Sequence, residues 1–184
     1  MPVLDQEPAV WPEQLFELEI EPGTFEQWHA FQVRPRTEKA VARCLRSRQI
    51  SYFLPQIKRQ KRYQRRLVCS HLVLFPGYVF ARASDQNLVR PLESKAIIRT
   101  LKIDDQERIE KELREIHRLT QSGQPLTREE RLQPGSPARI TCGPLTGLCG
   151  QIVNNKRGQR FVLQVQFIQQ GVSVEIDSSM IEAL

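Results

Sequence analysis

The stretch from residue 74 to residue 82 constrains the fold most, because a turn dipeptide is followed there by alternating side chains. In Pro76-Gly77 the proline presets φ, and the glycine accepts the positive φ that follows. Tyr78, Phe80 and Arg82 then point to one side of an extended segment, with small apolar residues on the other. The small apolar side predicts packing in a core. The aromatic side leaves two interpretations open, burial beneath a helix or a binding surface.

Patterns on both sides of this stretch predict an α+β domain. Residues 28–33 read as a strand, and Thr37 is placed to cap a helix that reaches about residue 49. The capping-box-like Asp104-x-x-Glu107 predicts the start of a second helix, which ends near residue 120. Further strands are predicted at 51–54, 72–82 and 96–101. The apolar stripe of the second helix consists of Ile109, Leu113, Ile116 and Leu119.

Positive charge is concentrated in the central third of the chain. The formal net charge is +6, but residues 28–102 hold 17 basic and three acidic residues. Residues 1–27 hold seven acidic residues and no Lys or Arg, while residues 103–184 are close to neutral. This partition predicts a polyanionic partner for the central third, although a solvated basic face would give the same counts.

Two segments are expected to be exposed. The densest basic run, residues 56–66, surrounds Tyr63 and has no strong apolar face, which predicts a β-hairpin or loop. Residues 1–27 combine four prolines with scattered acids, a composition typical of a flexible segment that buries little apolar surface.

The last fifty residues alternate short apolar stretches with glycines. Strands are predicted at 138–141, 151–153, 161–166 and 172–176, and this spacing is typical of a small β-barrel. The β-branched residues of these stretches favour strands over helices. Turns are predicted at Gly143, Gly147 and Gly150, and a linker rich in polar residues, Gly and Pro at 121–133.

The sequence contains no residue pattern that indicates catalysis. Its three histidines are scattered, no Ser or Cys has an evident base and orienting partner, and no Walker-type loop is present. Four cysteines without C-x-x-C spacing predict reduced thiols and no metal. No apolar run approaches the roughly 20 residues that span a bilayer, and the N-terminus lacks the pattern of a signal peptide. We therefore expect a cytoplasmic, monomeric protein that is not an enzyme and carries no cofactor.

The order of these features resembles the NusG family of transcription elongation factors. The resemblance rests on the Trp28 strand and the basic helix after it, on Phe75-Pro76-Gly77-Tyr78-Val79, and on Gly143-Pro144-Leu145-x-Gly147-x-x-Gly150, which is similar to a KOW motif. It implies an NGN-type helix–antiparallel-sheet sandwich at 28–120 and an SH3-like KOW β-barrel at 134–184. The acidic N-terminal extension and the short basic hairpin favour a specialised RfaH-like or UpxY-like paralog.

The resemblance also implies partners and contact residues. The NGN domain of the family binds the clamp helices of the largest RNA polymerase subunit and faces upstream and non-template DNA, and the KOW domain recruits a termination factor or a small-subunit ribosomal protein. The matching polymerase-binding positions are Trp28, Ala30, Gln32, Phe75, Pro76, Tyr78 and Phe80. The matching nucleic-acid contacts are Arg34, Arg36, Lys58, Arg59, Lys61, Arg62, Tyr63, Arg65, Arg66 and His71. Phe167 and Ile168 fall in the partner-binding loop of the KOW domain.

Several alternatives remain open at the level of sequence. A ribosomal-type KOW protein that binds RNA would share the glycine pattern, and a nucleic-acid-modifying enzyme would share the basic run. The apolar character of Phe167 and Ile168 would also be explained if these residues only close the barrel. The implied function is transcription elongation or antitermination by a protein that binds RNA polymerase, associated with the bacterial nucleoid.

Overall fold

The computed structural model describes residues 7–17, 26–63, 66–84, 87, 95–129, 135–155 and 158–184. The chain divides into two compact units, residues 1–106 (unit 1) and residues 107–184 (unit 2). Helices and antiparallel sheets occur together in the described residues, and this confirms the predicted α+β class.

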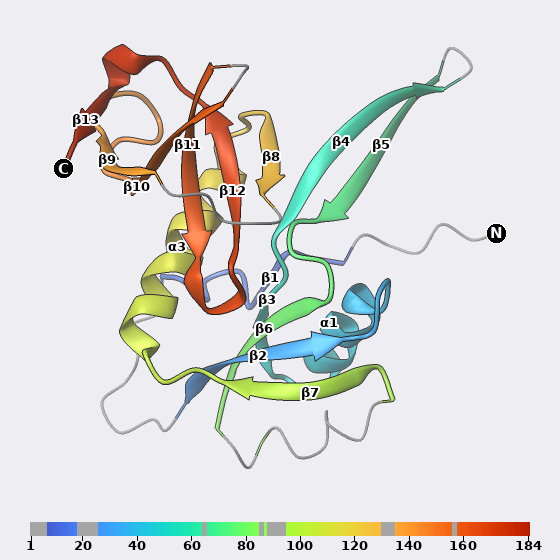
Figure 1. The fold of residues 1–184 in the computed structure, drawn as a ribbon. Coiled ribbons are helices and arrows are strands. Elements are labelled where there is room, and N and C mark those ends of the chain that lie inside the picture. The colour runs from blue at the N-terminus through green and yellow to red at the C-terminus, as the bar shows by residue number, and fades with distance from the viewer. Residues whose placement is uncertain are drawn as a thin grey trace. The chain divides into compact units, whose positions relative to one another are not determined.

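Unit 1 is built on a five-stranded antiparallel sheet in the order β1-β3-β6-β2-β7 (Figure 1). The predicted strand after Pro76-Gly77 is β6, at the centre of the sheet. Gly77 has a φ of 83°, the conformation that the turn dipeptide predicted. The strands are β1 (Val10–Trp11), β2 (Gln27–Val33), β3 (Ser51–Phe53), β6 (Tyr78–Ala83) and β7 (Ile97–Lys102).

Helix α1 (Glu38–Ser47) buries its apolar stripe against one face of this sheet. Val41, Ala42 and Leu45 pack in one cluster with residues of β2 and β6 that alternate toward the helix. Thr37 precedes the helix as predicted, but its hydroxyl donates to the Arg34 carbonyl and makes no cap. Glu38 instead joins the helix to the Pro76-Gly77 turn, because its carboxylate accepts the Gly77 N–H at 2.8 Å.

The basic run forms a hairpin, as the sequence predicts. β4 (Gln56–Tyr63) and β5 (Arg66–Val73) pair as a separate two-stranded antiparallel sheet. Figure 1 shows the two strands as a long ribbon that leaves the main sheet of unit 1. At its base the Leu74 N–H donates to the Pro55 carbonyl at 2.8 Å, which closes the hairpin onto the sheet.

Unit 2 combines helix α3 (Gln106–Gln121) with a six-stranded antiparallel sheet. The first residue of α3, Gln106, is the last residue of unit 1. All four residues of the predicted stripe of α3 are buried. The sheet order is β13-β9-β10-β11-β12-β8. The strands are β8 (Leu126–Glu129), β9 (Ser136–Ile140), β10 (Cys149–Asn155), β11 (Gly158–Val165), β12 (Gln170–Glu175) and β13 (Ile181–Ala183). Short 3-10 turns lie at Gln166–Ile168 and Ser178–Met180.

Three details differ from the sequence-based expectations. Residues 126–129 lie in the expected linker but form β8, because they pair with β12. Residues 7–17 lie in the expected flexible extension but pack onto the rest of unit 1, with Leu15 and Phe16 buried. Gly143 and Gly147 have positive φ, whereas Gly150 lies within β10. A Cβ at Gly150 would come within 2.6 Å of the Val162 carbonyl oxygen, so the glycine serves close strand packing there and not a turn.

Candidate functional site

The register of β2 and β6 brings five of the predicted polymerase-binding residues onto one face of the sheet. Trp28 pairs with Arg82, Ala30 with Phe80, and Gln32 with Tyr78. Directly paired residues on antiparallel strands share a face, and this face is opposite to the one that α1 covers. We call Trp28, Ala30, Gln32, Tyr78 and Phe80 the aromatic face.

Burial separates the residues of this face into two groups. Trp28, Ala30 and Phe80 are at most 1% exposed, whereas Gln32 and Tyr78 are half-buried. Of the other two predicted positions, Phe75 is buried and meets Phe80 edge to face at 6.2 Å between ring centroids, and Pro76 is exposed. Tyr78 is therefore the aromatic side chain of this face that reaches solvent in the structure.

Phe16 is part of the candidate site although the sequence placed no function on it. Its ring stacks on Trp28 with centroids 5.9 Å apart and an interplanar angle of 16°. It also meets Phe53 edge to face at 5.0 Å. The N-terminal segment thus places an aromatic ring against one end of the aromatic face. A Phe among acids and prolines was the available signal, but nothing local to it identifies Trp28 as its partner.

Glu7 is also buried, and it binds a cluster of side chains on α1 and β3. Its carboxylate accepts from Arg43 Nε at 3.1 Å and lies 3.4 Å from an Arg46 guanidinium nitrogen. The Tyr52 hydroxyl donates to the Pro8 carbonyl at 3.2 Å and lies 3.4 Å from Glu7. Burial, and then the Glu7 carboxylate, raise the pKa of the Tyr52 hydroxyl, so it stays protonated and able to donate.

The predicted nucleic-acid contacts are distributed over two places in unit 1. Arg34 and Arg36 are exposed in the turn between β2 and α1, where Arg36 has a φ of 68°. Lys58 and Arg59 are exposed on β4, and Lys58 pairs with the half-buried His71 on β5. Of the remaining predicted contacts, the backbones of Lys61, Arg62, Tyr63 and Arg66 lie in the hairpin strands, and Arg65 lies outside the described residues.

Lys39 is a basic residue at the hairpin that the predicted contacts did not include. Its Nζ donates to the His71 carbonyl at 2.9 Å, which ties α1 to β5. Burial, followed by the charges of Lys39 and Lys58, lowers the pKa of His71. The base of the hairpin therefore carries Lys39, Lys58 and Arg59 beside a histidine whose pKa is lowered, which disfavours its charged form.

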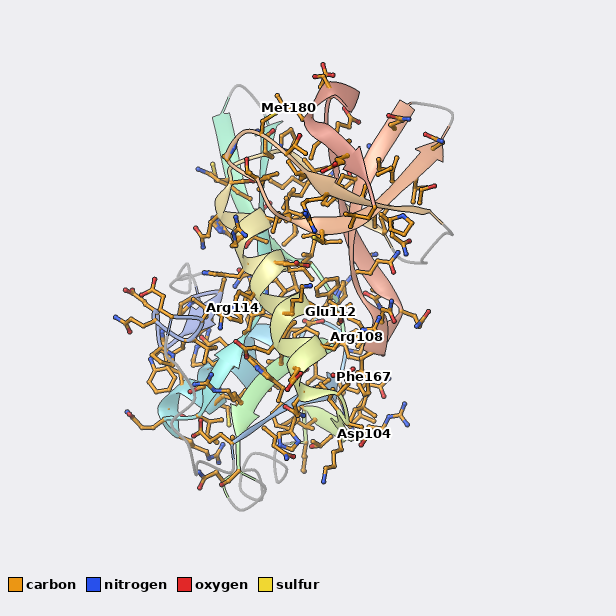
Figure 2. The ribbon with its side chains drawn as sticks, turned by 90° about the vertical axis from the view of Figure 1, so that its left-hand side faces the viewer. Asp104, Arg108, Glu112, Arg114, Phe167 and Met180 are labelled. Carbon is orange, nitrogen blue, oxygen red and sulfur yellow. The ribbon has the colours of Figure 1, made fainter. Side chains whose placement is uncertain are left out.

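In unit 2 the predicted partner loop places its two apolar residues differently. Ile168 is buried, in keeping with closure of the β domain, whereas Phe167 is 40% exposed. The backbone N–H of Gln166 donates to Glu112 at 3.2 Å, and Arg108 also binds that carboxylate, at 3.1 Å. Figure 2 labels Arg108 and Glu112 on α3 and Phe167 in the loop that Glu112 contacts.

A cavity of about 320 Å³ lies between the polar side of α3 and strands β10 and β11 of unit 2. Arg108, Lys111, Glu112 and Glu115 contribute charges of both signs to its lining. Burial raises the pKa of Glu115, an effect that Lys111 and a hydrogen bond from the Cys149 backbone partly offset. Among the described residues, no group of His, Cys, Asp and Glu side chains is placed to hold a metal ion. All four cysteines, each in the described part of the chain, are free.

The fold and the site define a class of protein: a helix–sheet unit that carries an aromatic face and a basic hairpin, followed by a unit with a small β-sheet. The family model described as "NusG: Transcription termination factor nusG" matches residues 26–130. Because this match covers more than half of the sequence, the chain belongs to the NusG family, and the resemblance inferred from its motifs is confirmed. Family membership gives the protein a general role in transcription.

Comparison with solved structures and curated proteins adds two findings. A structure described as "Domain interaction in Thermotoga maritima NusG" is similar at 18% sequence identity, with 86% of this chain and 97% of that chain covered and a TM-score of 0.47. No curated protein matches the chain. In the part of the chain that the structure describes, none of the helices has the length and apolar composition needed to cross a membrane.

Proposed function

We propose that this protein is a transcription elongation or antitermination factor that binds the clamp helices of RNA polymerase through the aromatic face of unit 1. The observation that carries the proposal is the strand register, which gathers Trp28, Ala30, Gln32, Tyr78 and Phe80 on one face. An apolar face of this kind suits helix-in-groove recognition. The exposed hairpin would contact upstream or non-template DNA, since lysine and arginine attract phosphates regardless of sequence. Exposed Phe167 would serve a second partner of unit 2, a termination factor or a ribosomal protein.

Tyr78 and Phe80 provide the experiment that tests this function. Tyr78 is half-buried, so Tyr78→Ala should leave the melting temperature nearly unchanged and lower the affinity for a clamp-helix fragment about 30-fold, since aromatic anchors account for about 2 kcal/mol. Phe80 is fully buried, so Phe80→Ala should instead destabilise the fold by roughly 3–5 kcal/mol. Calorimetry and thermal unfolding on the same samples separate the two effects.

Leu72→Ala is the matched control, because it shortens a 38%-exposed apolar side chain on the hairpin and not on the aromatic face. We expect it to bind the clamp-helix fragment like the unmodified protein. If folded Tyr78→Ala also binds normally, the aromatic face is core only, and the polymerase site lies elsewhere.

A further inference from the structure

Residues 7–17, which we call the strap, contact the rest of unit 1 along their length. The Tyr52 hydroxyl donates to the Pro8 carbonyl and the Gln56 side-chain amide donates to the Glu7 carbonyl. β1 pairs with β3, and the Leu54 N–H donates to the Ala9 carbonyl at 2.6 Å. The Glu7 carboxylate binds the arginines of α1. At the other end Phe16 packs against Trp28 and Phe53. The strap therefore runs from an ion-pair cluster to the aromatic face.

The Glu7 attachment has the burial pattern of a reversible contact. Glu7 is 2% exposed, whereas its partners Arg43 and Arg46 are 45% and 42% exposed. When the strap is bound, the buried carboxylate depends on the two arginines, because an unpaired buried charge is strongly unfavourable. When the strap leaves, Glu7 returns to water and both arginines remain accessible to solvent. Release therefore leaves no buried charge without a partner.

The Phe16 attachment occupies a surface that the proposed function needs. The ring of Phe16 covers Trp28 on β2, which is one end of the aromatic face. The same ring contacts Phe53 on β3, the residue that pairs with Phe80. A helix that docks against Trp28 needs the position that the ring of Phe16 occupies. The aromatic ring and the helix cannot occupy that position together.

We propose that the strap is an intramolecular competitor of the polymerase clamp helices, held closed by Glu7 and displaced when the clamp helices bind. This inference rests on the proposed function of the aromatic face. The apparent affinity for the clamp helices is then reduced by the fraction of molecules with an open strap. Weakening the Glu7 attachment raises that fraction and strengthens polymerase binding.

The test uses Glu7→Lys in the full-length chain, which places a cation against Arg43 and Arg46. Glu13→Lys is the matched control, since it makes the same charge change on the same segment at an exposed position. Strap opening is measured by hydrogen exchange of the Leu54 amide, which does not depend on polymerase. Affinity is measured with the clamp-helix fragment. A chain lacking residues 1–17 is the second variant, and it keeps the test valid if Glu7→Lys folds poorly.

We expect Glu7→Lys to speed exchange at Leu54 at least tenfold and to raise clamp-helix affinity by a similar factor, with the deletion giving an equal or larger gain and Glu13→Lys giving neither. Faster exchange at Leu54 with unchanged clamp-helix affinity would overturn the inference that the strap competes with the clamp helices, and would leave the proposed function intact. Unchanged exchange in Glu7→Lys would show that Glu7 does not hold the strap, which also overturns the inference. If no form binds the clamp helices, the deletion included, the proposed function fails and the strap inference fails with it.

Discussion

At the scale of single residues, Glu115 shows how burial makes a charge unfavourable. Its carboxyl lies half-buried against β10, and burial raises its pKa above the ordinary value. A carboxyl with a raised folded-state pKa binds protons more strongly in the folded protein than in the unfolded chain. Its contribution to stability is therefore present below the unfolded pKa and disappears as pH rises through the folded pKa.

Glu115→Gln should accordingly stabilise unit 2 at pH 7. The amide removes the charge and keeps an acceptor for the Cys149 N–H. The gain in melting temperature should shrink as pH falls toward 4, where the native carboxyl is protonated anyway. Thermal unfolding of the variant and the unmodified protein at pH 4, 5.5 and 7 measures this. Glu107→Gln, exposed on the same helix, should show no such gain, and a pH-independent effect of Glu115→Gln would contradict the explanation.

Residue roles were predictable from the sequence where they follow from local alternation. The alternation around Tyr78 predicted small apolar and aromatic side chains on opposite faces, with the small ones in a core. The structure shows that the small side chains face α1. Glu7 was not predictable, because its partner Arg43 is 36 residues away and Tyr52 is 45 away. Nothing in an acidic, proline-containing segment indicates that one of its carboxylates is buried.

At the scale of elements, the hairpin was predicted from its lack of an apolar face. Its positive charge predicts that it binds nucleic acid in a salt-dependent way. Lys58→Gln together with Arg59→Gln should weaken binding to a transcription bubble at low salt. The dependence of log affinity on log salt concentration should become shallower by close to one unit for each phosphate that the variant no longer neutralises. Titrations at several salt concentrations provide the slope.

The matched control removes two exposed arginines from α3, Arg108→Gln with Arg114→Gln. It makes the same change in net charge outside the hairpin, so its salt slope should stay like that of the unmodified protein. Equal slopes in both double variants would mean that only the net charge of the chain matters, and that the hairpin is a solvated surface.

Other elements were predicted less well because their pairing partners are distant in sequence. β8 has only four residues, and it is a strand because it pairs at the edge of the sheet with β12, more than forty residues later in the sequence. β1 has two residues and depends on β3 in the same way. Local composition cannot separate such edge strands from a linker or a flexible extension, since two to four residues are too few to show an alternating pattern.

At the scale of the whole molecule, the predicted domain boundary and the packing in the structure divide the chain at different places. The sequence predicts a boundary after residue 120, and the family match extends to residue 130. The structure instead groups α3 with the β-sheet of unit 2. We call residues 122–184 the β domain. The hydrogen bonds between α3 and the β domain come from exposed or half-buried side chains of the helix: Glu112 to Gln166, Glu115 to the Cys149 backbone, and Arg118 to the Thr146 carbonyl.

These polar interactions predict that the β domain folds without α3. Exposed ion pairs and hydrogen bonds contribute about 0–1 kcal/mol each, whereas the sheet has its own core of buried Ile140, Leu148, Phe161, Leu163 and Val172. A fragment of residues 122–184 should therefore melt within a few degrees of a fragment of residues 107–184. Failure of the shorter fragment to fold would make α3 part of the β domain.

A third fragment, residues 134–184, tests the predicted linker, because it begins after β8. Its truncation removes four backbone pairs with β12 and the Glu129 carboxylate. That carboxylate accepts the hydroxyl of buried Ser173 at 2.6 Å and lies 3.5 Å from Arg160. The Ser173 hydroxyl keeps the bond that Arg160 donates at 3.2 Å, but its own proton loses the Glu129 acceptor. An unsatisfied buried polar group costs about 1–3 kcal/mol, so this fragment should be less stable than residues 122–184, as measured by thermal and denaturant unfolding. In the fragment 122–184, Glu129→Gln should reproduce only a part of that destabilisation, since it keeps the strand and an acceptor for Ser173.

Equal stability of the 134–184 and 122–184 fragments would contradict this prediction. It would mean that β8 contributes nothing to the stability of the fold, and that residues 121–133 act only as a linker.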